Sequence, residues 1–301
     1  MSDSPLFSII IPTFNQSSFL DKAINSVLLQ KKNYEIIIID NYSTDNTEEI
    51  VAKYKNHNLK YLKIKNLGII GKSRNLGIKN SRAPWIAFLD SDDEWYENKL
   101  LHLEEFIDKN PDYDVITNDE EIMYEGTKKK IVWKYGPFTK DFYKKLIIEG
   151  NCVSTSASVV KKNFLLEKSI WFSEKETFAS VEDYDFFLNL AFNQAKFKFI
   201  HKTLGKHFFH RNSFSRNFER HHKALEALLN YHINHVQKFT NDKKKLLKKV
   251  NSNLSIIKSF DEIKFNKDIF KGFLILAKDF LKNPIYLIFC LIKKISYKLK
   301  I

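Results

Sequence analysis

Cysteine is scarce in this chain of 301 residues: Cys152 and Cys290 lie far apart, and neither belongs to a CxxC pair. This pattern excludes a disulfide framework and offers no zinc-binding spacing, and it favours a reducing, cytosolic setting. The N-terminus, MSDSPLFSIIIPTF, lacks a basic segment and has only a brief apolar run, so it predicts a first strand and not a secretory signal. We therefore expect the folded part of the chain to remain in the cytoplasm.

Long apolar runs are also missing near the C-terminus, where Ile285 to Ile292 falls far short of the ~20 residues that a membrane-spanning helix needs. From His221 to Ile301, seventeen lysines, no arginine and six acidic residues leave a surplus of eleven positive charges, most of the net +13. In Phe270 to Leu281 apolar residues recur at helical spacing with lysines between them. This pattern favours a peripheral anchor on an anionic membrane; the alternative is ordinary helices packed on the rest of the protein.

Strand and helix patterns alternate in the first part of the chain, which predicts an α/β fold with a doubly wound, mostly parallel sheet. The expected strands are Phe7 to Ile11, Tyr34 to Asp40, Lys60 to Ile64 and Trp85 to Asp90. Shorter strands beyond about residue 110 predict a mixed-sheet second half: Asp114 to Asn118, Ile131 to Tyr135, Val153 to Val160, Phe197 to His201 and Gly205 to His210. A helix is expected from Val181 to Gln194, and a basic helical extension from Arg216 onward.

Polar clusters follow three of these strands: Pro12 to Asn15, Asp40 to Ser43, and Asp90 to Asp93. Parallel strands place such clusters on one rim of the sheet, where ligands bind. The carboxylates of Asp90 to Asp93 would select Mg²⁺ or Mn²⁺, and the alternative is an acidic cap for a helix starting near Trp95. Asp40 requires hydrogen-bond donors at a buried strand end, whereas Asp45 is expected to cap a helix.

Leu67 to Asn75 resembles a phosphate-binding loop that opens a helix, although its glycine spacing fits neither a P-loop nor GxGxxG.

Four motifs in order, SIIIPTFN (8–15), IIIIDNYSTDNT (36–47), GKSRNLGI (71–78) and FLDSDD (88–93), resemble family 2 glycosyltransferases with the GT-A fold. The resemblance is clear from residue 7 to about 95 and weaker through about 216. It implies a catalytic domain over 1–215, with a nucleotide-binding half of about 1–110 and an acceptor half of about 111–215, followed by a basic helical region over 216–301. The QxxRW motif of processive synthases is absent, which favours transfer of one sugar, or a few, over polymerisation.

The resemblance also assigns roles to single residues in this chain. The nucleotide pocket would be lined by Pro12, Thr13, Phe14 and Asn15, with Asp40 on the base, Arg74 beside it, and Asp90 and Ser91 on the ribose side. Asp92 would bind Mn²⁺ or Mg²⁺, and Asp93 would be a variable third carboxylate. These roles imply a UDP-sugar donor, although Asn41-Tyr42 replaces the Asp-Gly of many relatives.

By the same resemblance, Asp183 matches the base of an inverting displacement, with Asp185 as a nearby competitor. On residue types alone, Glu182 and Asp183 would simply favour a helix N-terminus. His210 would ligate the metal or the diphosphate, because the segment from His210 to Ser215 is similar to the family's His-x-x-Ser-x-Ser, and Arg211 would contact a phosphate.

These roles predict transfer to a hydroxyl of a glycan or lipid-linked acceptor, as in surface polysaccharide or lipopolysaccharide synthesis, at the inner face of the cell membrane. A sugar-phosphate nucleotidyltransferase is one alternative, but it should carry a Gly-rich, Arg-containing loop where this chain has Pro12 to Gln16. A non-catalytic basic membrane- or RNA-binding protein is the other. No nucleic-acid partner is expected, because aromatic platforms and an Arg-rich stripe do not accompany the lysines.

Overall fold

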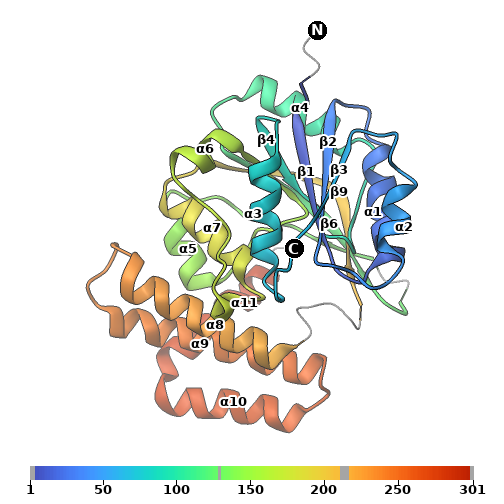
Figure 1. The fold of residues 1–301 in the computed structure, drawn as a ribbon. Helices are drawn as coiled ribbons and strands as arrows, with labels where there is room; N and C mark the ends of the chain where they lie inside the picture. The colour runs from blue at the N-terminus through green and yellow to red at the C-terminus, as the bar shows by residue number, and fades with distance from the viewer. Residues whose placement is uncertain (1–3, 128–129, 211–216, 299–301) are drawn as a thin grey trace. The chain divides into compact units, whose positions relative to one another are not determined.

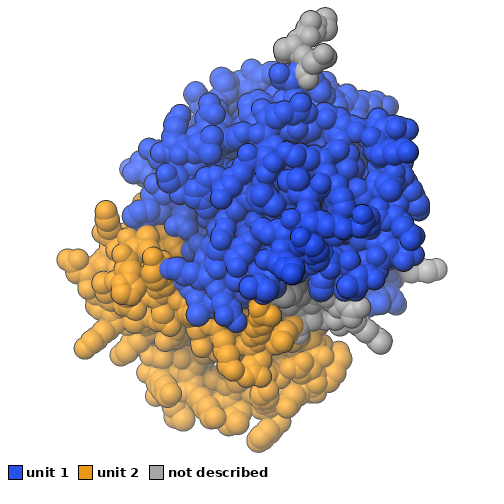
Figure 2. Space-filling model, viewed as in Figure 1, with its two compact units in different colours: residues 1–140, 152–216 blue, residues 141–151, 217–301 orange. Residues whose placement is uncertain are grey.

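The computed structural model describes residues 4–127, 130–210 and 217–298. The chain divides into two compact units, shown in blue and orange in Figure 2. Unit 1 comprises residues 1–140 and 152–216, and unit 2 comprises residues 141–151 and 217–301. Segment 141–151 therefore belongs with the C-terminal helices, a grouping that the sequence pattern does not reveal.

A mixed sheet with strand order β3-β2-β1-β4-β8-β6-β9-β5 forms the centre of unit 1. Its parallel part is made of β1 (Phe7–Thr13), β2 (Tyr34–Asp40), β3 (Leu59–Lys63) and β4 (Trp85–Phe88). Strand β8 (Ser158–Lys161) runs antiparallel to β4 and to β6 (Val115–Tyr124), and β7 (Lys130–Trp133) pairs with β6. The predicted α/β sheet with a mixed second half is confirmed.

Two expectations for the second half are wrong. The strand predicted at Val153 to Val160 begins only at Ser158, as β8. The two short strands predicted at Phe197 to His201 and Gly205 to His210 form a single strand, β9 (Phe197–Phe209), parallel to β6. The ladder shifts register beside Asp119, and the polar residues Lys202 and Thr203 lie at this irregularity. A β-bulge therefore breaks the apolar pattern without ending the strand. The second half of β9 also pairs with the two-residue strand β5 (Glu94–Trp95).

Helices cover both faces of the sheet, and the alternation of isoleucines in β1 explains how (Figure 1). Ile9 and Ile11 join a core cluster with α1 (Ser17–Leu28) and α4 (Lys99–Lys109). Ile10 points to the other face, where it meets Gly77 of α3 (Ile70–Asn80). The remaining helices of unit 1 are α2 (Thr47–Ala52), α6 (Lys162–Glu167), the 3₁₀ turn η1 (Glu176–Phe178) and α7 (Glu182–Phe192).

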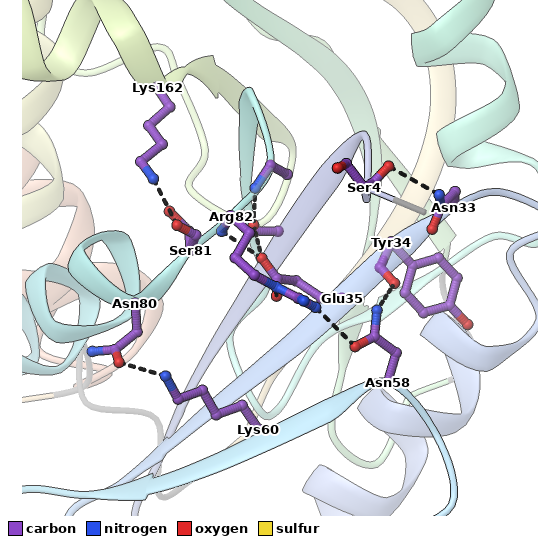
Figure 3. A network of polar contacts seen from close by, with 12 residues as sticks. Ser4, Asn33, Tyr34, Glu35, Asn58, Lys60, Asn80, Ser81, Arg82 and Lys162 are labelled. Carbon is purple, nitrogen blue, oxygen red and sulfur yellow. Dashed lines mark hydrogen bonds and ion pairs between the residues drawn. The ribbon is translucent and has the colours of Figure 1, made fainter. Parts of the chain in front are cut away.

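Polar contacts close the amino ends of the parallel strands, as Figure 3 shows around Glu35. This buried carboxylate accepts hydrogen bonds from Ser8 Oγ at 2.6 Å, from the Arg82 backbone N–H at 2.6 Å and from Arg82 Nε at 2.8 Å. Burial acts to raise the pKa of Glu35, but the Ser8 and Arg82 bonds outweigh it and hold the pKa below its ordinary value. This network stabilises the amino ends of the strands, and the candidate functional residues lie at the carboxyl ends.

The two glycines of GKSRNLGI allow close packing of α3. A Cβ on Gly71 would lie 2.4 Å from the Ser173 carbonyl oxygen, and one on Gly77 would lie 2.5 Å from Ile10 Cγ2. Asn75 then ties the same helix to the backbone of Phe172 with two bonds of 2.9 Å. Close packing of α3 therefore accounts for the two glycines of this segment.

Gly71→Ala is expected to lower the free energy of unfolding by about 1–3 kcal/mol, the usual cost of overpacking, because a backbone carbonyl cannot move aside as a flexible side chain would. Urea unfolding followed by circular dichroism measures this change. Lys79→Ala on the exposed side of the same helix is the control and should change stability by less than about 0.5 kcal/mol. Equal stability of Gly71→Ala and the wild type would contradict the packing argument.

Unit 2 is helical. It contains α5 (Phe142–Glu149), α8 (Phe218–Tyr231), a π-helical turn (His232–Val236), α9 (Lys243–Lys264), α10 (Ile269–Lys282) and α11 (Pro284–Lys298). Asp242 caps α9 by accepting the Lys245 N–H, and Pro284 begins α11. Within the part of the chain that the structure describes, none of the helices has the length and apolar character needed to cross a membrane.

Candidate active site

The acidic turn Asp90 to Asp93 follows β4 at the carboxyl edge of the sheet. The helix-cap alternative for this turn is wrong, because β5 comes next and α4 begins only at Lys99, after Asn98. The turn is held by its neighbours: the Asp90 N–H donates to Ser156 Oγ at 3.1 Å, and Ser91 Oγ donates to Gln16 Oε1 at the start of α1. The turn that carries the carboxylates is therefore held in place by hydrogen bonds, and none of these carboxylates caps α4.

Arg74 connects this turn to α7. Its guanidinium is buried and donates to Asp90 Oδ1 at 2.7 Å and to Glu182 Oε1 at 2.8 Å. Burial disfavours the charge, but Asp90 and Glu182 raise the pKa of Arg74 above its ordinary value, so it stays a cation. The Asp90 side chain remains 32 % exposed. This geometry favours a positioning role for Arg74, with Asp90 left available at the rim.

Asp92 faces His210, which lies just beyond the end of β9. Asp92 Oδ2 and His210 Nε2 are 2.9 Å apart, and this hydrogen bond raises the pKa of His210. The ring of Phe19, from α1, stacks on the imidazole with centroids 4.7 Å apart. Three separate elements thus fix the orientation of one carboxylate and one imidazole, for which the family resemblance implies contact with the metal or the diphosphate. Arg211, the predicted phosphate partner next to them, lies outside the described residues.

Asp93 is a brace and not an open ligand. It is buried, and its two oxygens accept the Phe208 N–H at 3.0 Å and contact His207 Nδ1 at 3.1 Å. Burial raises the pKa of Asp93 to about 6, while the charge of His207 acts against this rise. The third carboxylate of the motif therefore anchors the acidic turn to β9.

Hydrogen bonds also connect the loops that follow β1 and β2. The Asn15 backbone is left-handed, with φ of 50°, and its side-chain oxygen accepts the Thr44 N–H at 2.7 Å. Asp40 is buried, and it accepts from Ser43 Oγ and Tyr61 Oη at 2.6 Å each. Both Asp40 oxygens are engaged, so a bound base would share or displace one of these donors. Of the other predicted pocket residues, Pro12 and Thr13 end β1 and Phe14 is exposed.

The expected cap is one residue off: the N-cap of α2 is Asn46, and Asp45 precedes it and anchors the first turn. It accepts the Thr47 N–H at 3.1 Å and also the Ser17 N–H at 2.9 Å.

Asp183 lies in the first turn of α7, near Arg74 and Asp90. Burial raises the pKa of its carboxyl to about 7, and the adjacent Glu182 adds to this rise while Arg74 opposes it. Asp185 is two residues further along the helix, about 200° around its axis, and it accepts from Asn189 Nδ2 at 3.1 Å. Acidic residues do begin α7, so the helix-start interpretation also holds, but it does not account for Asp183 beside the acidic turn.

A buried acid–base cluster beneath the turn is not apparent from the sequence. Lys99 is fully buried, donates to the Ser156 carbonyl at 2.7 Å and lies 4.3 Å from the centre of the Trp95 ring. Burial lowers the pKa of Lys99 to about 7, against the attraction of Glu120 and Asp93. Glu120 in turn accepts from Tyr135 Oη at 2.8 Å. A lysine that starts an amphipathic helix reads as a surface residue, so no sequence signal marks it.

The donor set at Asp92 and His210 fits a divalent cation. A carboxylate oxygen of Asp92 and an imidazole nitrogen of His210 lie 2.9 Å apart, close enough to contact the same ion. Mn²⁺ or Mg²⁺ commonly takes its other ligands from phosphate oxygens and water. Among the described residues, no group of three His, Cys, Asp or Glu side chains could hold a metal alone.

Known proteins share both the sequence and the fold of this chain. The sequence profile described as Glycosyl transferase family 2 matches residues 8–165. An uncharacterised glycosyltransferase of Rickettsia conorii is 46% identical over 105 residues, 34% of this chain and 17% of that protein. The poly(ribitol-phosphate) beta-N-acetylglucosaminyltransferase TarS of Staphylococcus aureus is 37% identical over 109 residues, 35% of this chain and 19% of the enzyme. The matched segments are thus a small part of these relatives.

The fold extends further than the sequence similarity. A crystal structure of residues 1–349 of S. aureus TarS has a TM-score of 0.64 at 22% identity, covering 92% of this chain and 80% of that one. A mannosyltransferase from Pyrobaculum calidifontis, solved with GDP-mannose and Mn²⁺, has a TM-score of 0.59 at 13% identity, covering 98% and 81%. The expected GT-A fold is therefore confirmed, and the chain belongs to glycosyl transferase family 2.

Proposed function

We propose that this glycosyltransferase moves one sugar, with inversion, from a UDP-sugar to a hydroxyl of a glycan or lipid-linked acceptor. One observation carries the proposal: Arg74 forms ion pairs with both Asp90 and Glu182. This brings Asp90, the proposed donor-side residue, close to Asp183 at the start of α7. S. aureus TarS, whose fold is similar, was solved with UDP-GlcNAc, which favours a uridine donor. Names of relatives such as the minor teichoic acid biosynthesis protein GgaA of Bacillus subtilis favour a surface glycopolymer as acceptor.

In the proposed reaction, Asp183 takes the proton of the acceptor hydroxyl as its oxygen bonds to the anomeric carbon. The bond from that carbon to the diphosphate breaks on the opposite face, and its electron pair leaves with the nucleoside diphosphate. A cation held by Asp92 and His210 would supply positive charge at the leaving diphosphate. Because Asp93 and Arg74 fix the acidic turn from two sides, these groups are oriented before the substrate binds.

The donor and the metal are tested together by thermal shift. UDP is expected to raise the melting temperature in the presence of Mn²⁺, and this rise should disappear when EDTA removes the metal. Because Asp40 would contact a uracil base in this proposal, GDP and CDP should shift the melting temperature less than UDP does. A shift with GDP alone would replace the uridine donor, and a full shift in EDTA would contradict the metal proposal.

The acidic side of the pH profile follows from Asp183. A base must be charged to accept a proton, and burial next to Glu182 raises the pKa of this carboxyl to about 7. We therefore expect kcat/KM to rise about tenfold per pH unit below that value and to level off above it. Initial rates between about pH 5 and pH 9 measure this. A profile that is flat on the acidic side would exclude Asp183 as the titrating base.

A further inference from the structure

The outward face of α10 is apolar, the reverse of what a helix on a soluble surface normally shows. Its inward face holds Gly272 and Asp279, and a Cβ on Gly272 would lie 2.5 Å from Ile263 Cγ1 of α9. Outward, Phe270 is 80 % exposed and Leu281 is 84 % exposed. A helix in a water-soluble domain usually buries its apolar residues, whereas most of the large apolar side chains of α10 are exposed and only Leu276 packs on the core cluster around Ile256.

Helix α11 also exposes apolar side chains. Its exposed apolar residues recur at the spacing of one helix face, and Ile285 at its start is 77 % exposed, whereas Leu287 and Cys290 turn inward onto Ile256. We call the combined surface the apolar face; it consists of Phe270, Phe273, Leu274, Leu281, Ile285, Ile288, Phe289 and Ile292. Exposed apolar residues gathered on two consecutive helices are typical of an interaction site.

Lysines accompany the apolar face. Lys278 and Lys282 of α10 are exposed among its aromatic and aliphatic side chains. A cavity of about 460 Å³ between α5, α9 and α11 begins at the same surface, because Ile285 and Phe289 also line it. The lining further includes Ile148, Phe239 and Leu246, and the lysines Lys144, Lys245 and Lys249. The ammonium of Lys249 lies 4.7 Å from the centre of the Phe289 ring.

We propose that unit 2 docks on an anionic lipid bilayer through the apolar face. The apolar side chains would enter the interface while lysines beside them meet the anionic phosphates, which is the charge and hydrophobic complementarity of a peripheral membrane helix. This proposal develops the peripheral anchor that the sequence pattern favours, and it does not depend on the proposed sugar transfer, because every residue in it belongs to unit 2.

Sedimentation with lipid vesicles tests the docking. The full-length protein is expected to sediment with vesicles of phosphatidylglycerol and phosphatidylcholine, to release as salt increases, and to ignore phosphatidylcholine alone. The triple variant Phe270→Glu/Leu281→Glu/Ile285→Glu should bind at least about tenfold more weakly, because three charges would have to enter the interface. The matched control, Leu29→Glu/Val132→Glu/Leu166→Glu, adds the same charge to exposed apolar residues of unit 1 and should bind much more tightly than the first triple variant.

Absence of wild-type binding, or an equal loss in both triple variants, would overturn the proposal. Should the first triple variant fail to fold, Phe270→Trp replaces it: the four native tryptophans lie in unit 1, so brominated lipids should quench the added one most. Lack of that quenching, or a wild type that self-associates through this face and ignores vesicles, would also overturn it. UDP binding in solution is measured in parallel, and its loss with vesicle binding intact would sink only the proposed donor site.

Discussion

Asp183→Asn is expected to lower the rate of sugar transfer by about 10²- to 10⁴-fold, the range that a general base contributes, while UDP binding with Mn²⁺ remains. Asparagine keeps the shape of the side chain but cannot accept the acceptor's proton. It also removes a carboxyl whose pKa is raised by burial and Glu182, so the fold should not be weakened. Single-turnover transfer from a UDP-sugar, monitored through the UDP released, measures the chemical step directly.

Asp185→Asn is the matched control, because it makes the same change two residues away on the same helix. Asp185 accepts from Asn189 within α7, so its replacement should change transfer far less than Asp183→Asn does. Full transfer by Asp183→Asn, together with a large loss in Asp185→Asn, would move the base from one carboxyl to the other.

Asp92→Ala is expected to lower transfer by at least about 10²-fold, the cost of removing one group that stabilises developing charge. It should also abolish the gain in UDP affinity that Mn²⁺ provides, because His210 alone would then hold the ion. Titration calorimetry with UDP, with and without Mn²⁺, separates this variant from Asp183→Asn, which should retain the gain. An unchanged response to Mn²⁺ in Asp92→Ala would remove Asp92 from the metal site.

The rim of the site could be predicted from local pattern. The run of isoleucines in β2 ends at Asp40 in both the sequence pattern and the structure, and the parallel order of β1, β2 and β4 brings their carboxyl ends to one edge. In such strands periodicity and burial act on neighbouring residues, so a short window of sequence carries the information. The GT-A resemblance then ordered these local signals into a fold that the comparisons confirm.

Partnerships across long separations were beyond such reasoning. Arg74 and Glu182 are 108 residues apart, and nothing in either segment specifies the other. The burial of Lys99 depends on Trp95 and Glu120 arriving from different strands. The apolar positions of α10 were visible as a helical stripe, but the close approach at Gly272, which decides the side that faces α9, is a tertiary property.

Segment 141–151 makes the C-terminal unit inseparable from the catalytic chain. Its helix α5 buries Phe142, Tyr143, Leu146 and Ile147, and it is held to the later helices by the Asn253 Nδ2 bond to the Ile148 carbonyl at 3.3 Å and by the Tyr143–His232 contact at 3.1 Å. A gene fragment that stops at residue 216 would contain α5 but lack the later helices that it packs against. Exchange of C-terminal modules between related enzymes would therefore have to carry two separate stretches of coding sequence, a constraint on recombination that a simple tail would not impose.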